Sequence, residues 1–312
     1  MHAIVFARHG GPEVLELRDV PEPVPGEGEV LVDVEAIGVN FRDIYERERE
    51  GYGSDAPAIL GAEAAGTVVG TGERLAWTAT PKSYAERVAV DRARAVAVPD
   101  GVSGELAAAA LLQGMTAHYL ANDSYPVQPG EWVVVHAAAG GVGLLLTQLV
   151  KLRGAHVLAT TSSQEKAELA RGAGADEVTG YEGFADRARE LTGGEGAAAV
   201  YDGVGRTTFD EGLRALRPLG SMILYGASSG EPEPVDVRRL AAGGSLYVQR
   251  PTLQTYTRTP ELLQARAAAL FELIADGRLD VRIGGRYPLA DARRAHEDLA
   301  ARRTTGKLLL IP

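Results

Sequence analysis

The sequence of 312 residues contains no cysteine. Disulfide bonds, thiolate metal ligands and cysteine nucleophiles are therefore excluded together. Six histidines are present, but none belongs to an H-E-x-x-H motif or to another pair at ligand spacing. His296 and Glu297 are adjacent, yet no second histidine follows at the required step. The sequence thus offers no recognisable set of metal ligands.

An excess of basic residues is also missing. Lys and Arg number 32 against 42 Asp and Glu, which gives a net charge of −10, and this balance disfavours nucleic acid and anionic membranes as partners. No apolar run approaches the ~20 residues of a membrane span, and the start "MHAIVFARHGG" lacks the pattern of a secretory leader. We expect a cytoplasmic protein that binds neither nucleic acid nor membrane.

The hydrophobic pattern changes along the chain. Hydrophobic residues make up 45% of it, which is enough for one large core or two medium ones, and two domains are expected. Up to about residue 112 it alternates with period two, as in "EVLELRDV" and "GEVLVDVEAIGV", which is typical of antiparallel strands. From about residue 113, short apolar strands such as "EWVVVH" alternate with helical segments such as "SQEKAELARGAG". This alternation predicts an α/β fold with a doubly wound parallel sheet.

The stretch "HAAAGGVG", residues 136–143, follows a predicted strand and opens a predicted helix. It lacks the first glycine of G-x-G-x-x-G, because Ala138 stands there. Gly140 would let the backbone approach a pyrophosphate, Gly143 would allow close packing of helix on strand, and the helix N-terminus would attract the anion. We interpret the loop as a dinucleotide site. The alternative is that the glycines only turn a strand into a helix.

The end of the next strand indicates which dinucleotide binds. An NAD site places a carboxylate there for the ribose 2′-hydroxyl, whereas this sequence has "TTSSQEK" at 160–166 and its first acid, Glu165, already lies in the helix. Ser162 and Lys166 suit a 2′-phosphate, so NADPH is favoured over NADH. Alternatively, Ser162 or Ser163 caps the helix and Lys166 is a solvated surface charge.

Hydride transfer to an unactivated ketone usually needs strong polarisation of its oxygen, often by zinc. Because no such machinery is visible, the acceptor is expected to be electrophilic already, such as a quinone or an enone.

Several motifs occur in the order of one known family: "GVNFRDIY" (38–45), "GAEAAGTV" (61–68), "LQGMTAHYL" (112–120), "HAAAGGVG", "VYDGVG" (200–205) and "YGASSG" (225–230). With the C-terminal "YPLADARRAHEDLAARRTTGKLLLIP", the chain resembles the zinc-independent quinone oxidoreductases, the zeta-crystallin-like branch of the medium-chain dehydrogenase/reductase family. Zinc-dependent relatives usually carry Cys where Asn40 stands and His where Ala62 stands.

The resemblance implies a GroES-like, mostly antiparallel β catalytic domain formed by residues 1–114 and 254–312. A Rossmann domain formed by residues 115–253 would bind NADPH, with a cleft between the two. Asn40 and Tyr45 would face the nicotinamide and the substrate. The other implied cofactor contacts are Thr116 at the nicotinamide, Gly140, Gly141 and Val142 at the pyrophosphate, Ser162, Lys166 and Tyr181 at the 2′-phosphate, and Tyr225, Gly226, Ala227, Ser228, Val248, Arg250 and Lys307 elsewhere along the cofactor.

The activity implied is transfer of hydride, or of single electrons, from NADPH to a quinone without a metal, with Asn40 and Tyr45 positioning the carbonyl. Asn40 could instead close a turn, and Tyr45 could be a packing residue. The alternative functions are reduction of an enone or alkenal, and a non-catalytic cofactor-binding protein of the crystallin or RNA-binding kind. Because the apolar "GSLYV" (244–248) is expected at a sheet edge, we also predict a homodimer.

Overall fold

The computed structural model describes residues 1–312 and divides into two compact units. The first unit combines residues 1–115 with residues 257–312, and the second comprises residues 116–256. Helix α2 (Gly104–Tyr119) runs across the boundary of the two residue ranges. No helix is both long enough and apolar enough to cross a bilayer.

The first unit is rich in β structure. Its larger sheet has the strand order β15-β16-β3-β5-β6-β8, with β7 paired to β3, and its smaller sheet has the order β2-β1-β4. All its strand pairs are antiparallel except β15 with β16. The strands are β1 His2–Phe6, β2 Leu15–Asp19, β3 Glu29–Val39, β4 Ala58–Ile59, β5 Ala64–Val68, β6 Arg74–Trp77, β7 Arg87–Asp91, β8 Ala95–Ala97, β15 Ile283–Pro288 and β16 Lys307–Ile311.

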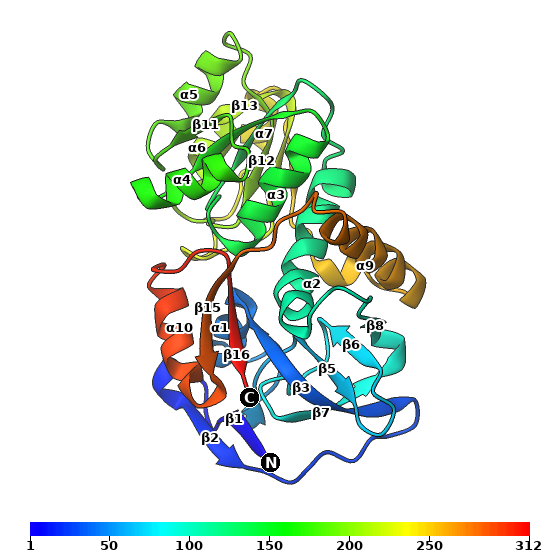
Figure 1. The fold of residues 1–312 in the computed structure, drawn as a ribbon. Coiled ribbons are helices and arrows are strands. Elements are labelled where there is room, and N and C mark those ends of the chain that lie inside the picture. Colours follow the sequence, from blue (N-terminus) through cyan, green and yellow to red (C-terminus); the bar gives the residue numbers. More distant parts are fainter. The chain divides into compact units, whose positions relative to one another are not determined.

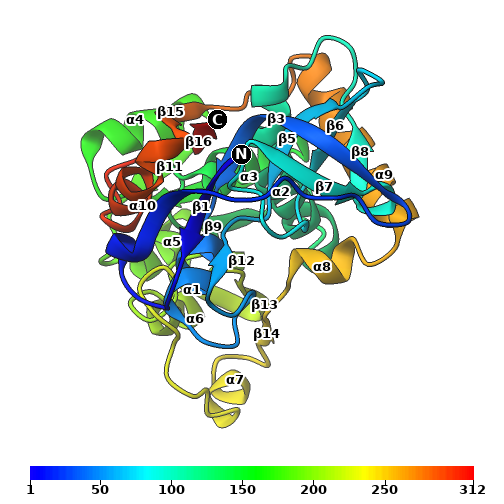
Figure 2. The same cartoon turned by 90° about the horizontal axis from the view of Figure 1, so that it is seen from below.

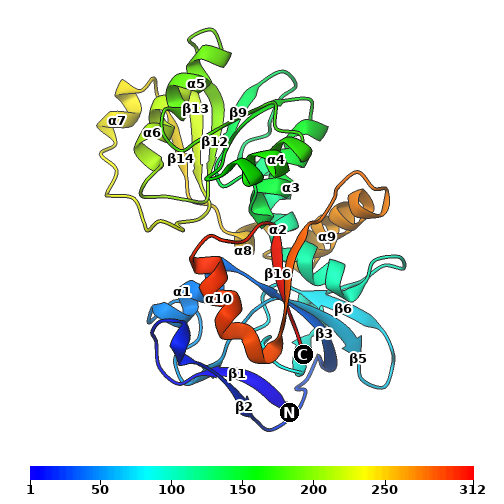
Figure 3. The same ribbon diagram turned by 60° about the vertical axis from the view of Figure 1, so that its left-hand side comes forward.

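The helices of this unit are α1 Phe41–Glu48, most of α2, α9 Pro260–Ala275 and α10 Ala292–Ala300. Helix α10 lies beside α1 and the β1–β2 hairpin (Figure 3). The alternating apolar residues of the strands form a core in which Phe6, Trp77 and Tyr84 are completely buried. Leu289, Leu308 and Leu310 belong to the same core, so the N- and C-terminal parts of the chain share it.

The second unit, drawn mostly in green and yellow in Figure 1, contains a six-stranded sheet of order β11-β10-β9-β12-β13-β14. Every strand pair in it is parallel. Helices α3 and α4 lie on one side of the strands, and α5 and α6 on the other (Figure 3). The elements are β9 Trp132–Val135, α3 Gly141–Leu152, β10 His156–Thr160, α4 Gln164–Gly172, β11 Glu177–Thr179, α5 Phe184–Leu191, β12 Ala197–Asp202, α6 Phe209–Ala215, β13 Leu216–Leu224, α7 Arg238–Ala242, β14 Tyr247–Gln249 and α8 Leu253–Tyr256.

Strand β14 is an edge of this sheet, and α7 precedes it at the periphery of the unit (Figure 2). Together, the β-rich unit and the doubly wound parallel sheet confirm the predicted fold class.

Candidate active site

The loops that follow the parallel strands lie at one edge of the sheet, because strands that run parallel end together. The chain moves outward from β9 to β11, then returns to β12 on the other side of β9 and continues to β14. Sheets of this kind bind ligands outside the carboxyl ends of the strands at such a switch point. The segments there include most of the predicted cofactor residues: 140–142 after β9, 162 and 166 after β10, 181 after β11, 225–228 after β13, and 248 and 250 in and after β14.

The glycine loop after β9 is shaped by close backbone packing. Gly140 is the N-cap of α3, and its N–H donates to the carbonyl of Ala137 at 2.9 Å. A Cβ on Gly143 would lie 2.4 Å from that same carbonyl oxygen, so only glycine fits. Ala138 does not need a positive φ, because the left-handed residue is Ala137, with φ of 50°. The tight turn thus begins one residue earlier than the motif suggests, and the helix N-terminus stays open.

Ser162 and Lys166 lie together at the end of β10. The Lys166 ammonium donates to the Ser162 hydroxyl at 3.4 Å, and the hydroxyl of Ser163 accepts the Lys166 backbone N–H at 3.3 Å. Ser163 is therefore the cap of α4. Ser162 is not consumed by capping, so it and Lys166 form a small polar corner.

Asp202 was not predicted as a site residue, although it belongs to the quoted "VYDGVG" stretch. It ends β12 and is completely buried, and its Oδ1 accepts the backbone N–H groups of Val204 at 2.7 Å and Gly205 at 2.9 Å. The ring of Tyr225 lies against the same loop, where a Cβ on Gly203 would come within 2.9 Å of it. Burial raises the pKa of Tyr225 well above its usual value. Asp202 thus fixes the backbone on which Tyr225 rests.

Arg250 joins two strand ends at this edge. Its Nη1 donates to the carbonyl of Leu224, the last residue of β13, at 3.0 Å. Val248, in β14, is 39% exposed. Contact of either side chain with a cofactor stays a prediction, as it does for Thr116 in α2.

Helix α1 carries two of the predicted residues in the first unit. Asn40 precedes the helix, and its backbone N–H donates to the Asp43 carboxylate at 2.9 Å, which helps to begin α1. Tyr45 follows on the helix and is partly exposed. Its ring meets that of Tyr52 edge-on at 5.7 Å, and the Arg49 guanidinium lies 4.7 Å from its centroid. Tyr45 is therefore held in an aromatic cluster.

The side chain of Asn40 belongs to a buried polar ring. Its Nδ2 donates to Glu63 Oε2 at 2.8 Å and to the Gly38 carbonyl at 3.2 Å. Its Oδ1 accepts from the Lys307 ammonium at 2.8 Å, and Lys307 also donates to Glu63 Oε2. Exposure is 4% for Asn40, 0% for Glu63 and 1% for Lys307. Asn40 is thus fixed by a charged group on each side of its amide.

Strand register brings this ring together. Val39 of β3 pairs with Leu308 of β16, and Ile37 of β3 pairs with Ala64 of β5, so the residues preceding Leu308 and Ala64 come beside residues 38–40. Gly38 leaves room for the carboxylate, since a Cβ there would lie 2.3 Å from Glu63 Oε2. Glu63 was not predicted as a site residue. The acid within the apolar "GAEAAG" was nevertheless a signal, because acids are rarely buried unless paired.

A second buried chain of hydrogen bonds links α10 to α1. The Tyr84 hydroxyl donates to Asp43 Oδ2 at 3.0 Å and lies 3.1 Å from His296 Nε2. His296 Nδ1 lies 3.1 Å from Arg47 Nη1. Because arginine can only donate, His296 accepts at Nδ1 and carries its proton at Nε2. All four side chains are at most 1% exposed.

Two members of this series of hydrogen bonds, Asp43 and His296, titrate in opposite senses. Burial raises the pKa of Asp43 from 3.8 to about 6, although Arg42 and Lys307 oppose the shift. Burial, with help from the Arg47 charge, lowers the pKa of His296 from 6.5 to about 3. Asp43 therefore favours folding more as pH falls from 6 towards 4, while His296 favours it less as pH falls below 6.5.

These two effects should nearly cancel between pH 6 and pH 4. In Asp43→Asn we expect the free energy of unfolding, relative to the unmodified protein, to fall by about 1.4 kcal/mol per pH unit on acidification through this range. In His296→Gln it should rise with the same slope. Urea unfolding at several pH values measures these free energies for the unmodified protein and both variants. If the three plots of free energy against pH ran parallel, the shifted pKa values of Asp43 and His296 would be contradicted.

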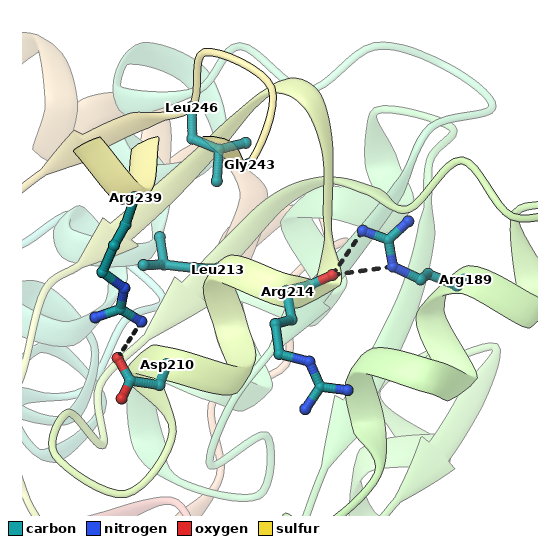
Figure 4. A pocket seen from close by; sticks show the side chains of 7 residues that line it. All are labelled: Arg189, Asp210, Leu213, Arg214, Arg239, Gly243 and Leu246. Carbon is teal, nitrogen blue, oxygen red and sulfur yellow. Dashed lines mark hydrogen bonds and ion pairs between the residues drawn. The ribbon is translucent and has the colours of Figure 1, made fainter. Parts of the chain in front are cut away.

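Neither unit gathers three or more histidine, cysteine, aspartate or glutamate side chains that could hold a metal ion. A pocket of about 280 Å³ lies elsewhere, lined by α5, α6, α7 and the segment after α7 (Figure 4). Its Arg239 pairs with Asp210 at 2.7 Å, and its Arg189 donates to backbone carbonyls, among them that of Arg214. It contains none of the predicted residues, so we do not assign the site to it.

Two family models match the chain: "Alcohol dehydrogenase GroES-like domain" over residues 26–122 and "Zinc-binding dehydrogenase" over residues 141–268. The chain is 44% identical to a quinone oxidoreductase of Pseudomonas aeruginosa over 99% of both proteins. The chain belongs to the zinc-binding dehydrogenase family. This confirms the predicted membership of the medium-chain dehydrogenase/reductases, among their quinone oxidoreductases.

Two further members of the family are informative. The Escherichia coli quinone oxidoreductase, solved as a complex with NADPH, is 40% identical, with a TM-score of 0.97 and complete coverage of both chains. A 2-haloacrylate reductase of a Burkholderia species is 34% identical over 99% of this chain and 98% of its own length.

The name of the zinc-binding dehydrogenase family raises the question whether this member fits zinc. The chain has no cysteine. Asn40, which stands where zinc-dependent relatives usually carry a cysteine ligand, is hydrogen-bonded to Glu63 and Lys307. An ammonium group next to Glu63 Oε2 would repel a divalent cation. The residues therefore do not fit a catalytic zinc ion.

Proposed function

We propose that the protein is an NADPH-dependent quinone reductase that transfers hydride without a metal. The observation that carries the proposal is its similarity, over the whole length, to quinone oxidoreductases, one of them solved with NADPH. The polar corner of Ser162 and Lys166 supports the choice of NADPH independently, since no carboxylate stands where an NAD site would need one.

The residues of the second unit fit this cofactor. The backbone of residues 140–142 at the open N-terminus of α3 would hold the pyrophosphate, where Gly143 keeps the loop tight. Ser162, Lys166 and Tyr181 would surround the 2′-phosphate. We assign further contacts to Thr116, Tyr225, Gly226, Ala227, Ser228, Val248 and Arg250. Lys307, which was also predicted to lie along the cofactor, is left out because its buried ammonium is bonded to Asn40 and Glu63. When bound, NADPH supplies the hydride.

In the first unit, Tyr45 would orient the quinone beside Asn40. Holding a substrate in the reactive geometry by itself accelerates hydride transfer. Glu63 and Lys307 hold the Asn40 amide in one orientation, so the polar surface of the site is preorganised. A reduced quinone takes its second hydrogen as a proton from solvent, which requires no general acid from the protein.

The proposal is tested by following NADPH oxidation at 340 nm with a panel of acceptors. We expect turnover with ortho- and para-quinones. The 34% identity to a 2-haloacrylate reductase favours one alternative, an NADPH-dependent reductase of activated double bonds. Clear turnover of 2-haloacrylates or 2-alkenals together with none of any quinone would establish that alternative and refute the proposal.

The choice of NADPH is tested by Lys166→Ala. Removing a charged donor to the 2′-phosphate should raise the dissociation constant for NADPH about tenfold or more and leave that for NADH nearly unchanged. Fluorescence titration measures both constants.

Arg171→Ala is the control, because Arg171 is an exposed cation near the other end of the same helix. It should affect neither constant. An equal weakening of NADPH and NADH in Lys166→Ala would show that Lys166 does not recognise the 2′-phosphate.

We further propose that two copies associate through β14. This strand pairs only with β13, and Tyr247 on it is 60% exposed. An unpaired apolar edge is a template for pairing with another chain, and a two-fold arrangement would close it.

Sedimentation velocity at micromolar concentration should therefore show a dimer for the unmodified protein and a monomer for Tyr247→Lys. Leu152→Lys is the matched control, because Leu152 is an exposed apolar residue (43%) in the same unit but lies on α3 rather than at this edge. A monomeric unmodified protein would refute this arrangement.

A further inference from the structure

Gln113 of α2 has a buried acceptor with no partner. Its side-chain Oε1 is covered by neighbouring atoms and makes no hydrogen bond, but the residue as a whole is only partly buried. Leaving such a group unpaired costs free energy that a bound donor would recover. An unsatisfied acceptor beside Asn40 therefore points to a ligand that carries an O–H or N–H group.

The neighbours of Gln113 determine which of its two amide atoms is left over. Its Nε2 approaches Asn40 Oδ1 at 3.5 Å, and that oxygen also accepts from the Lys307 ammonium. Turning the Gln113 amide over would bring two oxygens face to face, which is unfavourable. Because the ring of Asn40, Glu63 and Lys307 is itself fixed, Gln113 Oε1 is the acceptor left without a partner.

The chemistry of the substrate suggests the missing donor. A quinone has only acceptor oxygens, so it cannot satisfy Gln113 Oε1. On reduction it gains two electrons and two hydrogens, a hydride from NADPH, which leaves as NADP⁺, and a proton from solvent. Both carbonyl oxygens then become hydroxyls. Reduction of an activated double bond instead places hydride and proton on two carbons, and no new hydroxyl forms.

We propose that Gln113 Oε1 accepts the hydroxyl formed as the quinone is reduced, and so selects quinones over activated alkenes. This inference rests on the proposed quinone reductase activity. The hydrogen bond does not exist with the bound quinone and forms as the reaction proceeds, so it favours the transition state and product over the substrate. Gln113 is then a specificity-determining residue, held in orientation by Asn40.

The test compares hydroquinone with its dimethyl ether, which lacks the hydroxyl hydrogens. Calorimetric titration into the NADP⁺-saturated protein should show a preference for hydroquinone of about tenfold. Gln113→Met keeps the length of the side chain but removes the acceptor, and it should abolish the preference. Gln113→Asn, which withdraws the amide by one methylene, should do the same.

Gln264→Met is the matched control, because Gln264 lies in the same unit and donates to the Ala95 carbonyl at 2.7 Å. It should keep the full preference. If Gln113→Met and Gln113→Asn both keep it while the unmodified protein reduces quinones, the inference is wrong and the proposed function stands. If the unmodified protein reduces no quinone, the proposed function itself has failed.

Discussion

The buried ion pair between Lys307 and Glu63 is the interaction on which the first unit depends most. Two charges removed from water are costly unless their geometry is good and their remaining hydrogen-bond groups are satisfied. Here Asn40 bonds to both side chains, and the Leu112 backbone N–H donates to the other oxygen of Glu63 at 2.7 Å. Loss of either partner would leave an uncompensated buried charge. The pair thus ties the C-terminal strand to the N-terminal β structure at the candidate site.

Much of the fold could be predicted from local sequence, because each element carries its own pattern. "EWVVVH" predicted a buried strand, and "SQEKAELARGAG" predicted a helix that ends at glycine, which the structure has as β9 and α4. The alternation of such segments predicted the parallel sheet with its switch point. The glycine loop and the Ser162–Lys166 corner could be located for the same reason, since their residues lie close together in sequence.

The ring around Asn40 could not be predicted in this way, because its members come from distant parts of the chain. Lys307 reaches Asn40 only through the register of β16 on β3, and Glu63 reaches it through the register of β5 on β3. Sequence periodicity indicates that strands exist, but it does not give their register. A shift of register by one residue would move every side chain of a strand to the opposite face of the sheet. The chain of Asp43, Tyr84, His296 and Arg47 was missed for the same reason, and Asp43 on its own gave no sign of a shifted pKa.

The way this unit uses its polar groups bears on the kind of acceptor that it can reduce. Lys307 and Glu63 neutralise each other, and Asp43 is completely buried. The Asn40 amide donates both its hydrogens within the protein, one to Glu63 and one to the Gly38 carbonyl. Groups committed to one another in this way are well oriented, but they have little left with which to polarise a substrate carbonyl. Strong stabilisation of developing charge needs donors aimed at the reacting oxygen. An acceptor that is already electrophilic needs less stabilisation of this developing charge. The proposed quinone substrates are electrophilic before they bind.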